Sequence, residues 1–511
     1  MIRTIIGPFH FGMSVNSPIN AETIFAASFL QLILSSSQNG ISATHSQKLN
    51  LPGIRNSWLI AFLCIGTLAA YIPSLQVEFL ADDYAHLLAV SKADAHYAWN
   101  LFTVPAADHF FRPVGMLSYL LDIQWAGFSP FKWHLSAVIL HIINVVLVYF
   151  FCRAMNLLPE WSFFSAAFFS LHGSRPEVVT WIAARFDLIA TAFTLATLII
   201  FIRQVQSPSR WRRVVIVCTT IGALLSKEFA YTIPILLMIL IFFRKDLRKT
   251  VAYRTIVIIL LIAVCTFFYR WLLLKGIGGY QDQHGSPTIL NTNLWLIFKA
   301  LGLRLWAILF FPLNWTDSPH LILKTFLSSM IAGLLFLCYR IRPSSETSWG
   351  LLLTLISSLP VYHILLISSD LEKSRVIYLG SAFFALFLGK LLEQFPAKFS
   401  LTLAGIILCF QFFALQHNLR IWDRVGRIHV QACDALAKEA AKTPVVAVGM
   451  PNTFEGVYML KTGLSECIEI RHGIPAQSLL NVAQPGDIPS SSVALPRYGW
   501  DSNNASIFRI Q

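Results

Sequence analysis

The sequence contains few charged residues, which excludes a soluble protein. Only 13% of its 511 residues are charged and 56% are apolar, whereas soluble domains carry about 25% charged residues. So few polar side chains cannot cover a soluble particle of this size. We therefore predict an integral membrane protein.

The sequence also lacks a cysteine framework. Six of its eight cysteines lie in or beside apolar runs, where cysteine behaves as a small buried hydrophobe: Cys64, Cys152, Cys218, Cys265, Cys338 and Cys409. Cys433 and Cys467 lie in the polar C-terminal part. They could pair in an oxidising compartment, but nothing in the sequence fixes their distance, so we do not expect a disulfide. No Cys/His spacing typical of a metal site occurs.

A signal-peptide pattern is missing from the start of the chain. Residues 1–56 show no basic start, long apolar centre and small-residue cleavage site in that order. We predict that this segment is a poorly ordered N-terminal extension. Internal repeats are also missing from the whole sequence.

Positive charge is in excess, with a formal net charge of +13. Nucleic-acid binding would require the Lys and Arg residues to cluster on a folded soluble face. Most of them instead lie in short groups between long apolar runs, where they would anchor cytoplasmic loops. We therefore expect membrane lipids, and no nucleic acid, as partners.

Long apolar runs predict an all-α polytopic fold with about eleven transmembrane helices. The predicted spans are residues 57–75, 133–152, 160–172, 187–202, 214–226, 229–243, 255–274, 322–340, 349–368, 376–392 and 399–416. A further run, 294–311, is excluded because Lys299 and Arg304 interrupt it, and its helical periodicity is typical of a helix at the membrane surface.

The basic groups define a topology if eleven spans are present. They then fall on one side of the membrane: Arg55, Arg153, residues 203–213, residues 244–254, Arg340 with Arg342, and Lys390 with Lys398. By the positive-inside rule that side is cytoplasmic. The long loop 76–131 and the tail 417–511 then face away from the cytoplasm. We expect a multi-pass protein of a bacterial-type plasma membrane, with residues 57–416 as its membrane domain.

The tail differs in character from the rest of the chain. Residues 425–442 have the spacing of an amphipathic helix, which Pro444 ends, and Val445–Val448 read as a short buried strand. Residues 417–511 therefore predict a small external α+β domain.

An acidic pair, Asp82 and Asp83, lies at the start of the first loop, shortly after the first span. Like charges so close together, near a membrane, raise the pKa of one carboxyl group, which suits a general base or a cation ligand. A divalent cation is therefore one cofactor that the pattern allows. On a helix, His86 would lie on the same face as this pair. The alternative is that one of the aspartates caps a helix.

Further ionisable residues fall on the same predicted side of the membrane. They are His109 and Arg112 in the first loop, His172, Arg175, Glu177, Arg185 and Asp187 after the third span, then Lys227, Glu228 and Arg375. Each has an alternative structural role, such as an ion pair, a turn or a snorkelling side chain. Their convergence on one face is more informative, because cations at a membrane surface suit a lipid-linked phosphate.

Several of these motifs, taken in order, resemble a known family. They are Leu80-Ala81-Asp82-Asp83-Tyr84, Phe111-Arg112-Pro113-Val114, Trp133-His134 with His141 and Asn144, the run from Arg175 to Asp187, Ser226-Lys227-Glu228, and Arg375-Val376-Ile377-Tyr378-Leu379. The set resembles the multispan GT-C glycosyltransferases. It is most similar to the protein O-mannosyltransferase-like branch that carries tetratricopeptide repeats, although no repeats occur here.

The resemblance implies a hexosyltransferase that moves a sugar, such as mannose, from a polyprenyl-phosphate donor to a hydroxyl acceptor at the non-cytoplasmic face. It implies Asp82 as catalytic base with Asp83 as its neighbour, and the other ionisable residues together with Tyr378 as substrate-binding groups. One departure is Lys373-Ser374, which replace the acidic residue that usually precedes the arginine of the Arg-x-x-Tyr motif. The alternative function is a transporter or flippase of a lipid-linked or anionic substrate.

Overall fold

The computed structural model describes residues 53–511, except for residues 95, 106–108, 282–285, 291–292, most of 314–344, 366–370, 490–491, 493, 503 and 511. The predicted N-terminal extension lies almost entirely outside the described residues. The same holds for most of the predicted span 322–340.

Every other predicted span coincides with helical structure. The helices are α2 (Gly53–Ala70), α6 (Pro130–Ala154), α7 (Pro159–Leu171), α9 (Arg185–Gln206), α10 (Arg210–Leu224), α11 (Ile233–Phe243), α12 (Thr250–Leu274), α16 (Ser345–Ser358), α17 (Tyr362–Leu365), α18 (Tyr378–Leu392) and α19 (Ala397–Ala440). Within the described ranges, six helical stretches are long and apolar enough to cross a membrane, and two more are apolar but shorter. The chain is thus a multi-pass membrane protein, and the number of eleven spans stays a prediction.

The segment excluded from the spans is also helical. It comprises α13 (Leu294–Ile297), a π-helical stretch (Phe298–Arg304) and α14 (Leu305–Phe310). The apolar side chains of Leu305, Ile308 and Leu309 are buried against the bundle. The predicted position of this helix at the membrane surface stays a prediction.

Local sequence explains where several helices begin. Proline occupies the first position of α5 (Pro113–Ala126), α6, α7 and α8 (Pro176–Val179). Its fixed φ suits a first helical turn, and its missing N–H would have no partner inside the helix at that position. Helix α18 is the most enclosed, because α7, α9 and α16 all pack against it, and all of its side chains are buried.

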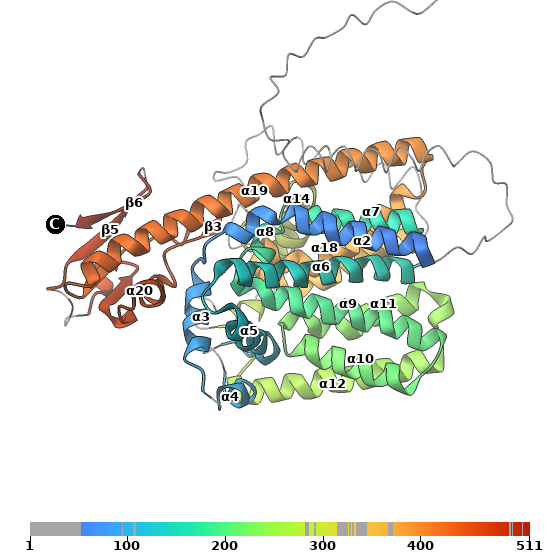
Figure 1. The fold of residues 1–511 in the computed structure, drawn as a ribbon. Coiled ribbons are helices and arrows are strands. Elements are labelled where there is room, and N and C mark those ends of the chain that lie inside the picture. The colour runs from blue at the N-terminus through green and yellow to red at the C-terminus, as the bar shows by residue number, and fades with distance from the viewer. Residues whose placement is uncertain are drawn as a thin grey trace, which may run out of the picture. The chain divides into compact units, whose positions relative to one another are not determined.

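The first loop forms three short helices at one end of the bundle. These are α3 (Asp82–Ser91), α4 (Tyr97–Thr103) and α5, which lie together at that end in Figure 1. The membrane helices α9 and α11 start at this end, whereas α10 and α12 finish there. Consequently the basic groups at residues 203–213 and 244–254 lie at the opposite end.

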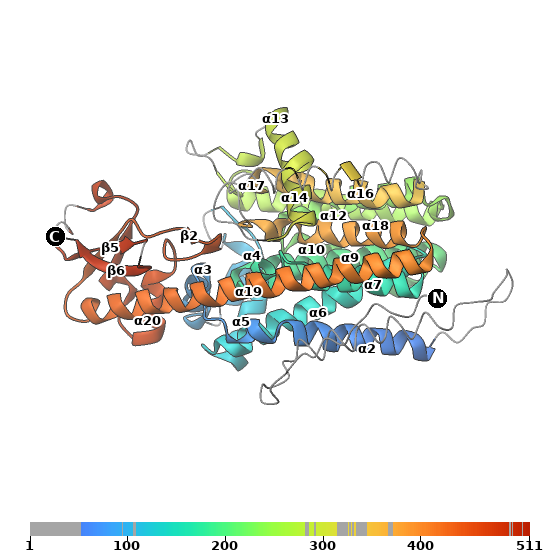
Figure 2. The ribbon, with the colours of Figure 1, turned by 90° about the horizontal axis from the view of Figure 1, so that it is seen from above.

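Helix α19 joins the bundle to the C-terminal part of the chain. It has 44 residues without a break, and at about 1.5 Å per residue its length is about 66 Å. The hydrocarbon core of a membrane is only about 30 Å thick, so α19 extends well beyond it. Figure 2 shows α19 running along the bundle and ending beside the C-terminal sheet. The predicted amphipathic helix 425–442 is therefore the last part of this single helix.

The C-terminal part contains a four-stranded sheet and one further helix. The strands are β1 (Val445–Val448), β4 (Leu479–Val482), β5 (Arg497–Asp501) and β6 (Ser506–Ile510), in the order β4-β1-β5-β6. Strand β1 pairs in parallel with β4 and β5, and β5 pairs antiparallel with β6. All four residues of β1 are buried, which confirms the predicted strand.

A hairpin and a disulfide complete this region. Strands β2 (Thr453–Phe454) and β3 (Val457–Tyr458) pair through a tight turn in which Glu455 and Gly456 both have positive φ, as a type I′ turn requires. Cys433 on α19 is disulfide-bonded to Cys467 on α20 (Leu464–His472). The expectation that these cysteines stay unpaired is wrong. The fold brings α20 alongside α19, and sequence spacing carries no information about that approach.

Candidate active site

A cavity of about 410 Å³ opens where the first loop, the ends of the membrane helices and the C-terminal part meet. Its lining residues are Asp82, Ala85, His86, Phe110, Arg112, Met116, Trp181, Ala183, Phe186, Lys227, Tyr280, Lys373, Arg375, Asn452, Tyr458 and Thr462. One carboxylate and four cationic side chains therefore face a single space. The segments that supply these five side chains are distant in sequence, from Asp82 in the first loop to Arg375.

The acidic pair is divided between two environments. Asp82, the first residue of α3, lines the cavity and is half-buried. Asp83 is fully buried, and its carboxylate accepts hydrogen bonds from the backbone N–H of Leu80 at 3.1 Å and of Ala183 at 2.7 Å. Burial raises the pKa of Asp83 to about 8, although these two N–H groups act to lower it. Neither aspartate is the N-cap of α3, because Ala81 occupies that position.

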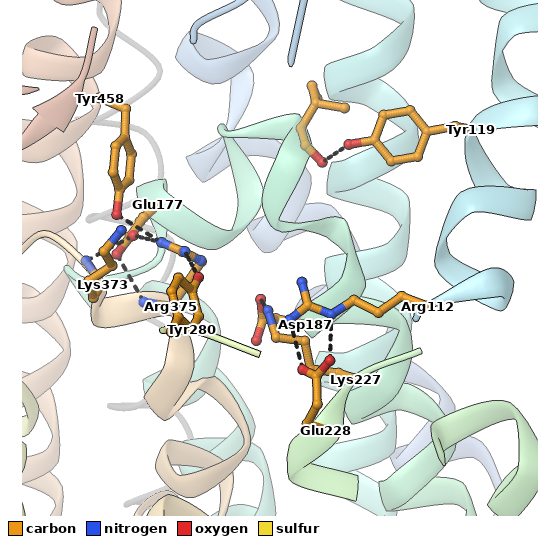
Figure 3. Close-up of polar contacts among 11 residues, drawn as sticks. Arg112, Tyr119, Glu177, Asp187, Lys227, Glu228, Tyr280, Lys373, Arg375 and Tyr458 are labelled. Atoms are coloured by element: carbon orange, nitrogen blue, oxygen red, sulfur yellow. Dashed lines mark hydrogen bonds and ion pairs between the residues drawn. The ribbon is translucent and has the colours of Figure 1, made fainter. Parts of the chain in front are cut away.

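Arg375 lies at the centre of a hydrogen-bonded network (Figure 3). Its guanidinium pairs with the carboxylate of Glu177, and it donates to the hydroxyl oxygens of Tyr458 at 3.1 Å and Tyr280 at 3.2 Å. The indole of Trp181 lies against it, with 4.6 Å from the guanidinium carbon to the ring centroid. Arg375 is only 5% exposed. It is therefore held in place inside the protein and does not snorkel.

Glu177 fixes the backbone around this arginine as well as its side chain. Its carboxylate accepts from the backbone N–H groups of Lys373 and Arg375, each at 2.9 Å, and from the hydroxyl of Ser374 at 2.9 Å. The acidic residue missing immediately before Arg375 in sequence is thus replaced in space by Glu177. This carboxylate positions Arg375, while only the arginine lines the cavity.

Two other predicted cations that line the cavity, Arg112 and Lys227, are held by different carboxylates. Arg112 donates two hydrogen bonds to Glu228, from Nε at 3.0 Å and from Nη2 at 2.7 Å. Lys227 Nζ lies 2.9 Å from Asp187 Oδ2, in an ion pair that is almost completely buried. Lys227 and Glu228 therefore do not form the local ion pair that their adjacency suggests. Both pairs hold a cation at the cavity wall.

The pKa of the Tyr280 hydroxyl indicates a positive electrostatic potential in the cavity. Burial acts to raise the pKa of its hydroxyl, but the four surrounding cations outweigh burial and lower that pKa overall. The four are Arg112, Lys227, Lys373 and Arg375. Positive potential that stabilises a phenolate would also stabilise a phosphate group. This part of the cavity is therefore suited to an anion.

Known proteins with similar sequences are protein O-mannosyl-transferases. No family model matches the chain. The chain is 25% identical to the protein O-mannosyl-transferase Tmtc1 of Drosophila melanogaster over 202 residues, which are 38% of this chain and 23% of that protein. It is 28% identical to the mouse protein O-mannosyl-transferase TMTC2 over 147 residues, which are 27% of this chain and 18% of that protein. Each match thus covers less than a quarter of the relative.

A solved oligosaccharyltransferase structure shares the architecture. The archaeal oligosaccharyltransferase AglB from Archaeoglobus fulgidus, solved with an inhibitory peptide and a dolichol-phosphate, matches with a TM-score of 0.50 and 11% identity over 85% of this chain and 65% of that chain. ArnT from Cupriavidus metallidurans bound to undecaprenyl phosphate has a TM-score of 0.47 and 12% identity over 88% of this chain and 94% of that chain. The fold is of the GT-C type. The predicted resemblance to GT-C O-mannosyltransferases is confirmed.

Within this GT-C fold, five of the predicted site residues line the cavity: Asp82, His86, Arg112, Lys227 and Arg375. His86 follows Asp82 by one helical turn, as predicted, and packs against the rings of Tyr119 and Phe186. Burial lowers the pKa of His86, while the Asp82 carboxylate acts in the opposite direction. Glu177 and Glu228 lie behind the wall and hold the arginines.

Other predicted residues lie away from the cavity and have structural contacts. Arg175 donates to the carbonyl oxygen of Phe169 at 2.8 Å and lies over the ring of Tyr378. The hydroxyl of Tyr378 is 2.6 Å from His141 Nδ1. Arg185 pairs with Asp122 at 2.7 Å. These contacts join neighbouring helices of the bundle and place no group in the cavity.

Two predicted histidines also lie outside it. His172 contacts the hydroxyl of Ser174 at 2.9 Å and the carbonyl oxygen of Leu309 on α14 at 3.0 Å. His109 is exposed and lies 3.2 Å from the amide nitrogen of Gln281. Neither lines the cavity, so neither is placed to contact a substrate there.

Some cavity residues were missing from the sequence-based set. Trp181 lies inside the run from Arg175 to Asp187, and Lys373 lies two residues before the motif that begins at Arg375, so proximity to these motifs was the available signal. Tyr280 follows two glycines after α12, in a segment without a recognisable pattern. Asn452, Tyr458 and Thr462 come from the C-terminal part. No sequence signal connects that part to the first loop, because only tertiary packing brings them together.

The acidic pair is poorly suited to hold a divalent cation. Both carboxylate oxygens of Asp83 already accept backbone N–H groups, so Asp82 and Asp83 do not offer two free carboxylates to one ion. In the described part of the chain, three metal-ligand side chains converge at Cys433, Asp434 and His472, but Cys433 is bonded to Cys467.

Proposed function

We propose that this protein transfers one sugar from a polyprenyl-phosphate carrier to a hydroxyl acceptor at the non-cytoplasmic face of the membrane, with inversion at the anomeric carbon. The observation that carries the proposal is the shared cavity of Asp82 and four cations. A carboxylate opposite a cationic wall provides both groups that such a transfer needs, a proton acceptor and a stabiliser of the departing phosphate.

The residues divide the reaction between them. Asp82 takes the proton of the acceptor hydroxyl while the oxygen attacks the anomeric carbon, and the bond from that carbon to the phosphate oxygen breaks. The bonding electrons leave with the phosphate, whose charge Arg375 and the neighbouring cations stabilise. Glu177, Glu228 and Asp187 hold three of these cations in place. Donors that are already oriented need no reorganisation during the reaction, which lowers the barrier.

The distribution of basic residues supports the non-cytoplasmic side. The cavity lies at the end of the bundle opposite the basic groups at residues 203–213 and 244–254, which the positive-inside rule assigns to the cytoplasm. A sugar carrier that is anchored in the bilayer would present its phosphate at this boundary. The lipid tail would then lie between helices.

The relatives support a mannose-like sugar, since the curated matches are protein O-mannosyl-transferases. The AglB structure was solved with a dolichol-phosphate, which supports a lipid-linked phosphate as the donor of this protein. The acceptor class, whether protein, lipid or glycan, is what the first experiment must identify.

The test uses the purified full chain in lipid nanodiscs with polyprenyl-phosphate mannose and, in parallel, polyprenyl-phosphate glucose. We expect release of polyprenyl phosphate that depends on an acceptor fraction from the native membrane. Mass spectrometry of glycoproteins and glycans from cells with and without the protein identifies the product. An unchanged glycan profile together with altered movement of a lipid-linked substrate would instead support a transporter or flippase.

A further inference from the structure

The residue before Asp82 has an unusual backbone conformation. Ala81 has φ +46° and ψ −119° and is 1% exposed. Residues other than glycine rarely adopt positive φ, and such strained conformations persist only where the surrounding structure enforces them. Ala81 also sets the direction in which α3 begins, and therefore where the Asp82 carboxylate points.

The C-terminal part supplies the contact that enforces this conformation. Gly463, the N-cap of α20, has φ +76°, and a Cβ atom at this position would lie 1.8 Å from the carbonyl oxygen of Ala81 and 2.6 Å from its carbonyl carbon. No side chain fits in that space. The same carbonyl oxygen accepts the N–H of Tyr84 at 3.2 Å in the first turn of α3. Any displacement of Ala81 by residue 463 would therefore move the first turn of α3.

Several other contacts hold α20 against α3. The disulfide of Cys433 and Cys467 fixes α20 to α19 one turn beyond Gly463. Near the far end of α20, Glu469 pairs with Lys92 at 2.5 Å, immediately after α3. The ring of Tyr84 also stacks on His429 of α19, with 5.2 Å between centroids and 12° between planes. Helix α3 is thus held by both helices that the disulfide joins.

We infer that the C-terminal part positions the catalytic carboxylate: Gly463 supports Ala81, the Cys433–Cys467 disulfide keeps Gly463 in place, and Asp82 is thereby aimed into the cavity. This inference rests on the proposed transfer reaction for its kinetic consequence. Gly463 is a positioning residue, because it contacts Ala81 and does not line the cavity. The adjacent Thr462 does line it.

Two glycines of α20 provide a matched experiment. Gly473, at the other end of the helix, also has positive φ, at +68°, but a Cβ there would meet nothing within 4 Å. Gly463→Ala and Gly473→Ala therefore impose similar backbone strain, and only the first creates a collision with Ala81. We expect Gly463→Ala to lower kcat by about 10- to 100-fold, since small misplacements of catalytic groups have effects of this size. Donor KM should stay unchanged, and Gly473→Ala should keep the kcat and the donor KM of the unmodified protein.

A second readout does not depend on activity. Hydrogen exchange at the amides of Ala81 to Tyr84 should become faster in Gly463→Ala and stay unchanged in Gly473→Ala, with disulfide formation confirmed by thiol alkylation. Equal exchange and equal kcat in the two variants would overturn the inference. If the unmodified protein showed no transfer, the proposed function would fail. The hydrogen-exchange measurement would still test whether Gly463 supports Ala81.

The disulfide is tested separately, in case Gly463→Ala does not fold. The double variant Cys433→Ser with Cys467→Ser keeps Gly463 and removes the covalent link. We expect a smaller fall in kcat and faster exchange at the start of α3, with donor KM unchanged. Unmodified kcat and exchange in this variant would remove the disulfide from the inference.

Discussion

The Asp83 carboxylate accepts a hydrogen bond at 2.7 Å from the backbone N–H of Ala183, which lies 100 positions further along the chain. This bond joins the start of α3 to the segment that carries Trp181 and Ala183 into the cavity wall. Asp83 therefore connects two walls of the cavity, and Asp82 is the member of the pair that is left facing it. The two neighbouring carboxylates have different roles because that of Asp83 accepts hydrogen bonds from backbone N–H groups.

Asp82 should be essential for turnover. Asp82→Asn preserves the size of the side chain but removes the proton acceptor, so we expect kcat to fall by about 100-fold or more, with abundance and thermal stability largely unchanged. The control is Asp423→Asn, since Asp423 pairs with Arg427 on the outer face of α19 and should show normal activity. Near-normal transfer by the Asp82 variant in the purified assay would exclude it as the base.

Arg375 should determine the use of the donor. A guanidinium can bond Glu177, Tyr280 and a phosphate through separate N–H groups, whereas an ammonium acts as a point charge. Arg375→Lys should therefore raise donor KM and leave acceptor KM nearly unchanged, and Arg375→Ala should have a larger effect. Donor titrations of each variant make the measurement. An unchanged donor KM in Arg375→Lys would instead favour Arg112 as the residue that binds the phosphate.

Variants of the buried pair of Lys227 and Asp187 should distinguish its effect on stability from its effect on transfer. Asp187→Ala leaves Lys227 without its partner in a buried site, which costs about 3–5 kcal/mol, and we expect a clear fall in thermal stability in detergent. The double variant Asp187→Leu with Lys227→Met removes both charges and should recover most of that stability. It should not recover transfer, because a cation is lost from the cavity. Recovery of both would show that Lys227 has only a structural role.

Asp83 should make stability depend on pH. Its folded-state pKa of about 8 lies above the usual value of 3.8, so between these values the folded protein holds a proton that the unfolded chain has lost. The contribution of this group to stability therefore falls as pH rises toward about 8. His86 has a lowered pKa and acts below its usual value of 6.5, so stability is compared between pH 6.5 and 8.

Thermal unfolding of the unmodified protein and of Asp83→Asn across that range makes the measurement. The variant loses one backbone hydrogen bond, because an amide nitrogen cannot accept an N–H, and it should be less stable at every pH. Its stability should nevertheless vary less with pH. An equally steep dependence in both proteins would mean that another group titrates.

Topology can be tested with reporters. A reporter fused after Gln511 should lie outside the cytoplasm, and one inserted near Ser207, at the end of α9 away from the cavity, should lie inside. Protease accessibility of each fusion in sealed vesicles provides the measurement. If both reporters lay on the same side, either the segment 294–311 would span the membrane or one of the short predicted spans would not.

The sequence by itself determined the features that depend on local composition. Long apolar runs predicted the helices, because hydropathy and helical hydrogen bonding act within one segment. The acidic pair beside the first span, the cations around Arg375 and the strand Val445–Val448 could also be identified locally. The ordered motifs added the resemblance to GT-C enzymes, which the comparisons confirmed.

Tertiary structure alone decided which of these residues meet. Arg175 and Arg375 were comparable candidates in sequence, yet one lies against Phe169 and Tyr378 and the other faces the cavity. The contact of Glu177 with Arg375 spans 198 positions, and the disulfide and the Gly463 contact with Ala81 depend on how α20 docks. Periodicity gives the face that a helix buries, but the relative placement of helices is set by side-chain packing across the whole bundle, which no local pattern encodes.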